Sequence, residues 1–271
     1  MNFFIRDIVE KMNDDGVRSL LVKGQGLAQC YEKPQWRASG DIDFLLDQEN
    51  YKHAIGFLKT FTSKTKYGGK YSKETSFTIG TYTIEAHGTL RAGLSSRIDK
   101  VVDEVQEDTF INNRFRIWHI GQTEILLPAP DSDLFLVFTH LIKHFYKGGM
   151  NLRQICDLCR LLWAFKGRID SNLLEYRLRK AGLMCEWKVF STFAVDALGM
   201  TVEEMPLYEE DERWRKKGKI LSDYILQNRN PNKMKNTMAI ARVFPKNTLL
   251  SIPSIFLNVN RLKIEEQLFG R

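Results

Sequence analysis

Apolar residues recur along the chain with two periods, and their order divides it into two parts. In the first part, helical and strand patterns are mixed; Phe4, Ile8 and Met12, for example, recur at a spacing of four. Helices are predicted over 3–13, 26–31 and 49–61, and strands over 19–22, 40–46 and 114–120. Alternating apolar and Thr residues predict antiparallel strands within 65–90, with a turn at Gly80 and Thr81.

The second part begins after the sequence LPAP at 127–130, which interrupts regular structure. Beyond it, helical periodicity dominates and strand signals are few. Helices are predicted over 131–147, 151–166, 171–181, 185–198 and 211–227. This separation predicts an α+β fold, with a mixed β-sheet flanked by helices followed by a helical unit. We therefore expect one domain over 1–127 and a helical domain over 128–271.

Composition narrows the class of protein. The chain has 271 residues, 40 Lys and Arg against 33 Asp and Glu, and a net charge of +7. Its aromatic content excludes a disordered chain, and no apolar run approaches the roughly 20 residues of a membrane-spanning helix. We expect a cytoplasmic protein without an export signal, whose four cysteines are reduced core thiols. The positive charge favours an anionic partner, such as a nucleotide, a nucleic acid or a phosphorylated metabolite.

The strongest candidate for chemistry is the sequence GDIDF at 40–44. Alternate strand residues point to one face, so Asp41 and Asp43 should project together while Ile42 and Phe44 enter the core. Two such carboxylates repel each other unless a cation neutralises them, and oxygen ligands suit Mg²⁺. The alternative is an edge strand with two solvated Asp side chains.

A third carboxylate, Glu85, lies in the predicted strand Tyr82–His87 between apolar residues. If this strand adjoins the one that carries Asp41 and Asp43, the three acids complete a metal site. The alternative is an ordinary exposed Glu, and the sequence does not decide between the two.

Cations flank the same region. Lys23 and Gly24 follow the first predicted strand and precede a helix, where backbone N–H groups can hold a phosphate. Arg37 precedes Asp41 by four residues, and its guanidinium suits a phosphate. The alternatives are an ordinary turn with a surface Lys and a solvated loop Arg.

Further candidates lie in the helical part. His140 and His144 share a helix face and either bind zinc with Cys156 and Cys159 or line a cleft; core cysteines are the favoured reading of the two thiols. Arg153 forms an ion pair with Asp157 or faces the site, and the ion pair is favoured. Ten cations lie within 213–246, opposed there by Asp223 alone. They indicate a phosphate-binding surface or a solvated helix face.

The run LLVKGQGLAQCYEKPQWRASGDIDFLL at 20–46 resembles the opening motif of the uncharacterised nucleotidyltransferase-like family, within the DNA polymerase β-type superfamily. Ile84–His87 resembles the family's next motif of apolar residue, acid, apolar residue and His. The stretch 127–162, with His140, His144, Arg153 and Asp157, resembles its helical region. The resemblance covers roughly residues 1–165 in three ordered motifs.

The resemblance implies a nucleotidyltransferase fold over 1–127 and transfer of an NMP from an NTP to an acceptor hydroxyl. Asp41, Asp43 and Glu85 would be catalytic and bind two Mg²⁺ ions. Nucleotide contacts are implied for Lys23, Gly24, Arg37, Gly40, His140, His144 and Arg153. The chain departs from the wider superfamily in having Lys-Gly where Gly-Ser is usual.

The acceptor stays open among small molecules, sugars, proteins and RNA ends. Two other functions also stay open. One is a catalytically inactive nucleotide-binding or regulatory protein of the same fold, and the other is a nucleic-acid-binding protein that uses the basic C-terminal portion.

Overall fold

The computed structural model describes residues 1–271 except 63, 69–72, 148–151, 228–242 and 245–271. The chain forms two compact units, each assembled from separate stretches. The first comprises 1–91, 102–137 and 160–169, and the second comprises 92–101, 138–159 and 170–271. The division into domains at 127/128 stays a prediction.

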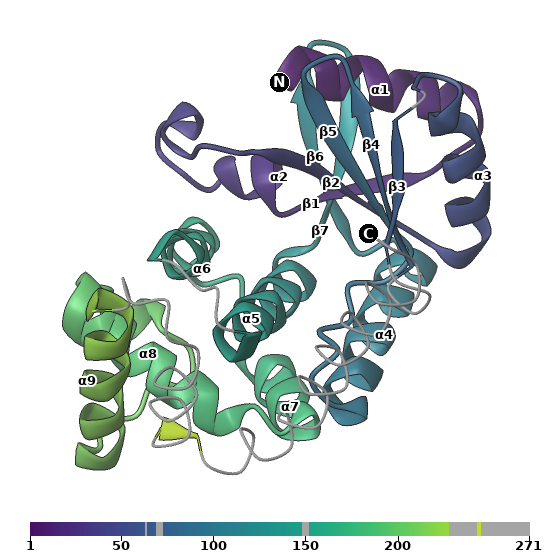
Figure 1. Ribbon diagram of the computed structural model, residues 1–271. Coiled ribbons are helices and arrows are strands. Elements are labelled where there is room, and N and C mark those ends of the chain that lie inside the picture. The colour runs from purple at the N-terminus through teal and green to yellow at the C-terminus, as the bar shows by residue number, and fades with distance from the viewer. Residues whose placement is uncertain (63, 69–72, 148–151, 228–242, 245–271) are drawn as a thin grey trace. The chain divides into compact units, whose positions relative to one another are not determined.

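The first unit is built on a mixed five-stranded sheet with the order β1-β2-β5-β4-β3 (Figure 1). Its strands are β1 (Ser19–Val22), β2 (Asp41–Leu46), β3 (Thr65–Tyr67), β4 (Glu74–Ile79) and β5 (Tyr82–His87). β2 and β5 are parallel, and the other neighbouring pairs are antiparallel. A separate antiparallel hairpin joins β6 (Phe115–Ile120) and β7 (Thr123–Pro128).

One face of the sheet carries the larger core of this unit. Ile42 and Phe44 of β2 lie there as predicted, together with Ile84 of β5. Buried residues of α1 (Asn2–Asp14) and α3 (Gln48–Lys59) pack onto this face, as do residues of β7. The opposite face has a smaller cluster that includes Leu45 and Phe110. Burial of the even-numbered positions of β2 in the larger core leaves Asp41 and Asp43 on the other face.

The remaining helices of the first unit are short or shared. α2 (Gly24–Ala28) and a 3₁₀ turn, η1 (Pro34–Trp36), lie between β1 and β2. The division between the units falls within α4 (Ser96–Ile111), α5 (Pro130–Lys147) and α6 (Leu152–Ala164).

The second unit is helical in its described part. It contains α7 (Ser171–Ala181), α8 (Met184–Leu198), the 3₁₀ turn η2 (Val202–Glu204) and α9 (Glu212–Gln227). Among the described helices, none is long and apolar enough to cross a membrane. The α+β class is thus confirmed, with a mixed sheet flanked by helices and a helical C-terminal part.

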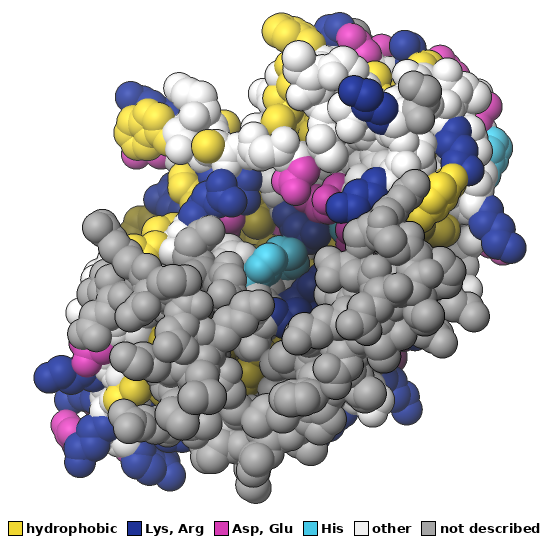
Figure 2. All heavy atoms as spheres, viewed as in Figure 1, with side chains coloured by type: hydrophobic (Ala, Val, Ile, Leu, Met, Phe, Trp, Pro, Cys, Tyr) yellow, Lys and Arg dark blue, Asp and Glu magenta, His cyan; other side chains and the backbone are white. Residues whose placement is uncertain are grey.

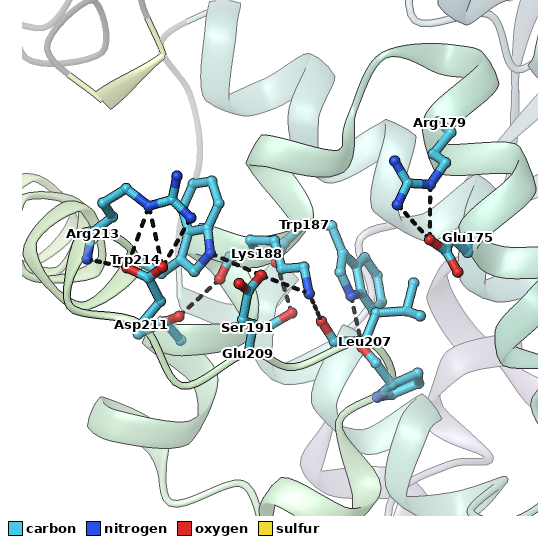
Figure 3. A network of polar contacts seen from close by, with 12 residues as sticks. Glu175, Arg179, Trp187, Lys188, Ser191, Leu207, Glu209, Asp211, Arg213 and Trp214 are labelled. Carbon is cyan, nitrogen blue, oxygen red and sulfur yellow. Dashed lines mark hydrogen bonds and ion pairs between the residues drawn. The ribbon is translucent and has the colours of Figure 1, made fainter.

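A network of polar contacts fixes the segment after η2 onto α8 (Figure 3). The indole of Trp187 donates to the Pro206 carbonyl over 2.8 Å. The ammonium of Lys188 donates to the Leu207 carbonyl and lies 3.2 Å from a carboxylate oxygen of Glu209. These bonds hold Leu207 in a positive-φ conformation, with φ 59°, that is rare for a residue other than Gly.

The cysteines differ in exposure. Cys30 is buried, Cys156 and Cys159 are half-buried, and Cys185 is exposed at the start of α8. The prediction of a core thiol was therefore wrong for Cys185, because the apolar pattern of α8 does not turn that position inward.

Candidate active site

The sheet places Asp43 directly beside Glu85. β2 and β5 are parallel neighbours, and the register pairs Asp43 with Glu85. His87 lies two residues after Glu85 and therefore projects from the same face. One ligand atom from each of Asp43, Glu85 and His87 lies within 4.8 Å of the other two. The strand that carries Glu85 therefore adjoins the strand that carries Asp41 and Asp43, which the sequence alone did not decide.

Asp43 is a buried carboxylate held by two nitrogen groups. The ammonium of Lys23 and Nε2 of His87 each lie 2.8 Å from Asp43 Oδ1. Burial alone would raise the pKa of Asp43, but the charge of Lys23 and the bond from His87 outweigh it and hold the pKa well below its usual range. Asp43 is therefore ionised across the physiological pH range.

Glu85 behaves in the opposite way. Burial raises the pKa of Glu85 to about 7, and the charges of Asp43, Glu74 and Asp41 add to the effect. A carboxylate with this pKa takes up and releases a proton near neutral pH.

His87 connects the acids. Its Nε2 lies 3.6 Å from Glu85 Oε2, and its Nδ1 lies 3.7 Å from Glu74 Oε2. Burial lowers the pKa of His87, the charge of Lys23 lowers it further, and the bond to Asp43 opposes both. The ring is therefore mainly neutral at pH 7 and orients Asp43 through a hydrogen bond.

Asp41 lies at the edge of this cluster. It pairs with Thr83 in the register, one step before the Asp43–Glu85 pair on the same face. Its side chain is half-buried, and its charge contributes to the raised pKa of Glu85. Asp41 is thus a peripheral member beside a buried pair.

The turn that carries Lys23 is strained. Lys23 has φ 56° and ψ −142°, a region that residues other than Gly rarely occupy and that costs on the order of 1–3 kcal/mol. Strain of this kind persists when the surrounding structure holds the residue in place, here through the bond to Asp43. α2 has only five residues, so the helix dipole that would favour a phosphate at its N-terminus is small.

Gly24 and Gly40 differ in what surrounds them. Gly24 has φ +27°, and a Cβ there would lie 3.3 Å from the Asp41 carbonyl oxygen. Gly40 has no atom within 4 Å of an added Cβ. Close packing therefore requires Gly at 24, and the structure shows no such requirement at 40.

Arg37 is buried rather than solvated. Its Nη1 donates to Ser39 Oγ over 2.7 Å and to the Ala38 carbonyl over 3.4 Å. The loop between α2 and β2 therefore closes onto a guanidinium, and the alternative of a solvated loop Arg was wrong.

The other candidates belong to the second unit. Nε2 of His140 lies 3.0 Å from Nε2 of His144 on α5, and Arg153 is an exposed residue of α6. The two His residues do share a helix face. The parts of these three residues in nucleotide binding stay predictions.

Two members of the cluster, His87 and Glu74, were not among the predicted site residues. Period-two spacing after Glu85 was a signal for His87, since it places both on one strand face. Glu74 had no local signal, because only the pairing of β4 with β5 brings it opposite His87.

A cavity of about 510 Å³ lies in the first unit near the end of β5. Two of its lining cations are paired with acids: Arg91 Nε lies 2.8 Å from Asp103 Oδ1, and Arg18 lies 4.0 Å from Asp47. The paired acids therefore compete with any phosphate for both guanidinium groups.

Acidic residues just before the basic stretch at 213–246 offset part of its positive charge. Acids lie at 209–211 before α9 and at its first residue, Glu212. Two of them pair with the first cations of the helix, Arg213 with Asp211 at 2.9 Å and Arg215 with Glu210 at 2.6 Å. Figure 2 shows acidic and basic side chains mixed over α9. Of the ten cations, Arg229, Lys233, Lys235, Arg242 and Lys246 lie outside the described residues.

Comparison with known proteins gives one decisive match. The sequence model of a family described as uncharacterised nucleotidyltransferase matches residues 2–194, well over half of the chain. No curated protein matches the sequence. Among solved structures, an antigenic nucleotidyltransferase-like protein from Paracoccidioides brasiliensis matches with a TM-score of 0.44 and 10% identity, covering 76% of this chain and 93% of that chain. On the family match, this chain belongs to the uncharacterised nucleotidyltransferase family.

Proposed function

We propose that this protein transfers a nucleoside monophosphate from a nucleoside triphosphate to a hydroxyl group of an acceptor. The observation that carries the proposal is the pairing of Asp43 with Glu85 on adjacent parallel strands. The two carboxylates share a sheet face with His87 and lie beside a Lys, in a chain of a nucleotidyltransferase family.

The cluster fits a divalent cation. Burial, and then the charges of Asp43, Glu74 and Asp41, raise the pKa of Glu85, and a cation of charge two beside the carboxylate would oppose this rise by favouring the ionised form. The carboxylate oxygens of Asp41, Asp43 and Glu85 are the hard ligands that Mg²⁺ prefers, and we propose that they hold two ions. When bound, Mg²⁺ neutralises the triphosphate and lowers the pKa of an attacking hydroxyl.

The chain's own residues have separable parts in this proposal. Glu85 completes the cation site and is also the candidate group to help deprotonate the acceptor's hydroxyl. His87 fixes the orientation of Asp43. Lys23 exchanges Asp43 for a phosphate oxygen when the nucleotide enters, because both partners are anions within reach of one mobile ammonium.

The finer assignments are also part of the proposal. ATP is the first nucleotide to test, and the acceptor is a hydroxyl-bearing small molecule, sugar, protein or RNA. Gly24 and Gly40 shape the approach to the phosphates, and His140, His144 and Arg153 contact nucleotide or acceptor. We place the protein in the cytoplasm.

The test is pyrophosphate release from the four NTPs with Mg²⁺ and a broad acceptor panel. Asp43→Asn and Glu85→Gln should each lower turnover by at least about 100-fold, since each removes a group from the reacting site. Asp14→Asn and Glu107→Gln, at exposed positions of α1 and α4, are matched controls that should retain full turnover. Equal turnover in Asp43→Asn and the wild type would sink the proposal.

A second function is favoured by one specific contact. Lys23 lies 2.8 Å from Asp43 and neutralises that carboxylate without a metal ion, which suits a protein that binds nucleotide but does not turn it over. Calorimetry distinguishes the two functions. NTP binding that is unaffected by EDTA, with no pyrophosphate released, would favour the regulatory function over catalysis.

A further inference from the structure

A buried Arg holds the hydroxyl of Ser39 beside the Lys23–Gly24 turn. Arg37 is only 9% exposed, and its Nη1 donates to Ser39 Oγ over 2.7 Å. A Cβ on Gly24 would lie 3.8 Å from the same Oγ atom. Ser39 therefore reaches across from the loop before β2 to the turn after β1, although 15 residues separate the two in the sequence.

The Ser39 hydroxyl has a hydrogen left to donate. A hydroxyl has one donor hydrogen and two acceptor lone pairs, and the bond from Arg37 uses a lone pair. Within the described part of the chain, no acceptor receives the hydroxyl hydrogen of Ser39. Its side chain is only half-buried, so a ligand can approach it. The group best suited to the hydrogen is one that only accepts, such as a phosphate oxygen.

We propose that Ser39 donates a hydrogen bond to a phosphate of the bound nucleotide and that Arg37 is the positioning residue for this contact. The inference rests on the proposed function and adds to it a phosphate ligand that comes from a different loop than Lys23. Arg37 acts through Ser39, because its guanidinium is buried and already donates to Ser39 and to the Ala38 carbonyl.

The nearby cation supports a phosphate rather than an uncharged ligand. Lys23 carries an ammonium on the same turn, and Gly24 keeps the space beside Ser39 free of a side chain. The Ser39 hydroxyl and the Lys23 ammonium lie on either side of the Gly24 backbone, which carries no side chain. Both groups are hydrogen-bond donors of the type that binds phosphoryl oxygens. A Cβ at Gly24 would intrude on this space.

The experiment is calorimetric titration of the full chain with inorganic triphosphate and with ATP, both with Mg²⁺. Inorganic triphosphate reports on the phosphate contacts whatever base the enzyme prefers. Ser39→Ala should weaken both affinities about tenfold, the usual size for a hydrogen bond to a charged group. Ser39→Thr keeps the hydroxyl and should bind within about threefold of the wild type. Ser39→Cys keeps the shape but has a weak donor, so it should resemble Ser39→Ala even if the Ala variant is less stable.

A double-mutant cycle tests the part of Arg37. Arg37→Lys keeps the charge but not the planar fork, and it should lose affinity to about the extent of Ser39→Ala. The two losses should not add in the double variant if Arg37 acts through Ser39. Additive losses would overturn the positioning role, because Arg37 would then contact phosphate itself.

The outcomes separate this inference from the proposed function. Wild-type affinity for triphosphate in Ser39→Ala and Ser39→Cys would overturn the Ser39 contact while leaving turnover and its loss in Asp43→Asn intact. A wild-type protein that binds neither triphosphate nor ATP would overturn both. Loss of affinity in both variants, with retention in Ser39→Thr, would support the contact.

Discussion

At the scale of single residues, the site is defined by opposite shifts in two neighbouring acids. Lys23 and His87 hold the pKa of Asp43 low, while burial and the surrounding charges raise that of Glu85 to about 7. One acid is thus a permanent anion and the other can exchange a proton near neutral pH. In the protein without a bound cation, this separation leaves Glu85 as the acid that titrates near neutral pH.

The raised pKa of Glu85 predicts a dependence of stability on pH. Its pKa rises from 4.5 to about 7 on folding, so at pH values between these two the folded state binds more protons than the unfolded state. Stability therefore falls as pH rises through this range, and the loss is complete above about 7. Glu85→Gln should be more stable than the wild type at pH 8 by on the order of 1–2 kcal/mol, and equally stable at pH 4.

Chemical denaturation of the metal-free protein at both pH values measures this difference. Glu107→Gln, at an exposed position, is the control and should behave alike at both pH values. A Glu85→Gln protein that is less stable than the wild type at pH 8 would contradict the account.

We expect alanine substitutions at Gly24 and at Gly40, the two glycines near the site, to differ in their effects. Gly24→Ala adds a Cβ 3.3 Å from the Asp41 carbonyl oxygen at a strained φ, so it should cost about 1–2 kcal/mol of stability and weaken triphosphate binding. Gly40→Ala meets open space and should leave stability nearly unchanged. Thermal melts and calorimetry on the pair test the contrast, which fails if the two variants behave alike.

At the scale of elements, the sequence patterns predicted most of the local structure. The short strands and helices before residue 62 and the helices after 130 lie within a few residues of their predicted positions. Alternation in β2 correctly placed Ile42 and Phe44 in the core, because side chains two residues apart project from the same face of a strand.

Among the described α-helices and strands, α4 and β7 were not predicted. The helix α4 buries Ile98, Val101 and Val105 on one side, but its apolar stripe is narrow and its charge content is high. β7 ends at Pro128, and the LPAP sequence was read as a break from its start. A Pro at a strand end removes no ladder hydrogen bond, so the strand extends into it.

Sheet order could not be predicted from the sequence. Asp43 and Glu85 are 42 residues apart, and only the β2–β5 pairing unites them. The contributions of Glu74 and Ser39 depend on β4 and on the loop before β2 in the same way. The local sequence pattern therefore indicated the candidate acids, whereas the long-range pairing of strands determined which residues lie beside them.

Polar contacts attach the segment 205–214 to α8 (Figure 3), and we expect that removing one of them destabilises this segment. Lys188 has a 16% exposed side chain and contacts the Leu207 carbonyl and Glu209. Lys188→Met should lower the free energy of unfolding by about 1–2 kcal/mol, because it removes the charged donor of the bond to the half-buried Leu207 carbonyl. It should also speed proteolysis within 205–214.

Arg179→Met is the matched control in the same unit. Arg179 forms an exposed ion pair with Glu175 one turn away on α7, and such pairs contribute at most about 0.5 kcal/mol. Equal stability losses in the two variants would contradict the structural role given to Lys188.

At the scale of the whole molecule, the cations of α9 and the candidate carboxylate site belong to different units. The candidate carboxylate site belongs wholly to the first unit, whereas five cations of α9 belong to the second and follow an acidic run that pairs with two of them. A net charge of +7 is therefore weak support for a nucleic-acid surface, and the proposed function rests on the sheet.

The central claim is that the carboxylates on β2 and β5 hold divalent cations for nucleotidyl transfer. The most direct test is a crystal structure of the full chain with Mn²⁺ and a non-hydrolysable NTP, with the ion located by anomalous scattering. The account predicts anomalous density about 2.1–2.2 Å from oxygens of Asp43 and Glu85, with the Lys23 ammonium moved from Asp43 to a phosphate. A bound nucleotide with no anomalous density at these oxygens, and with Lys23 still on Asp43, would contradict it.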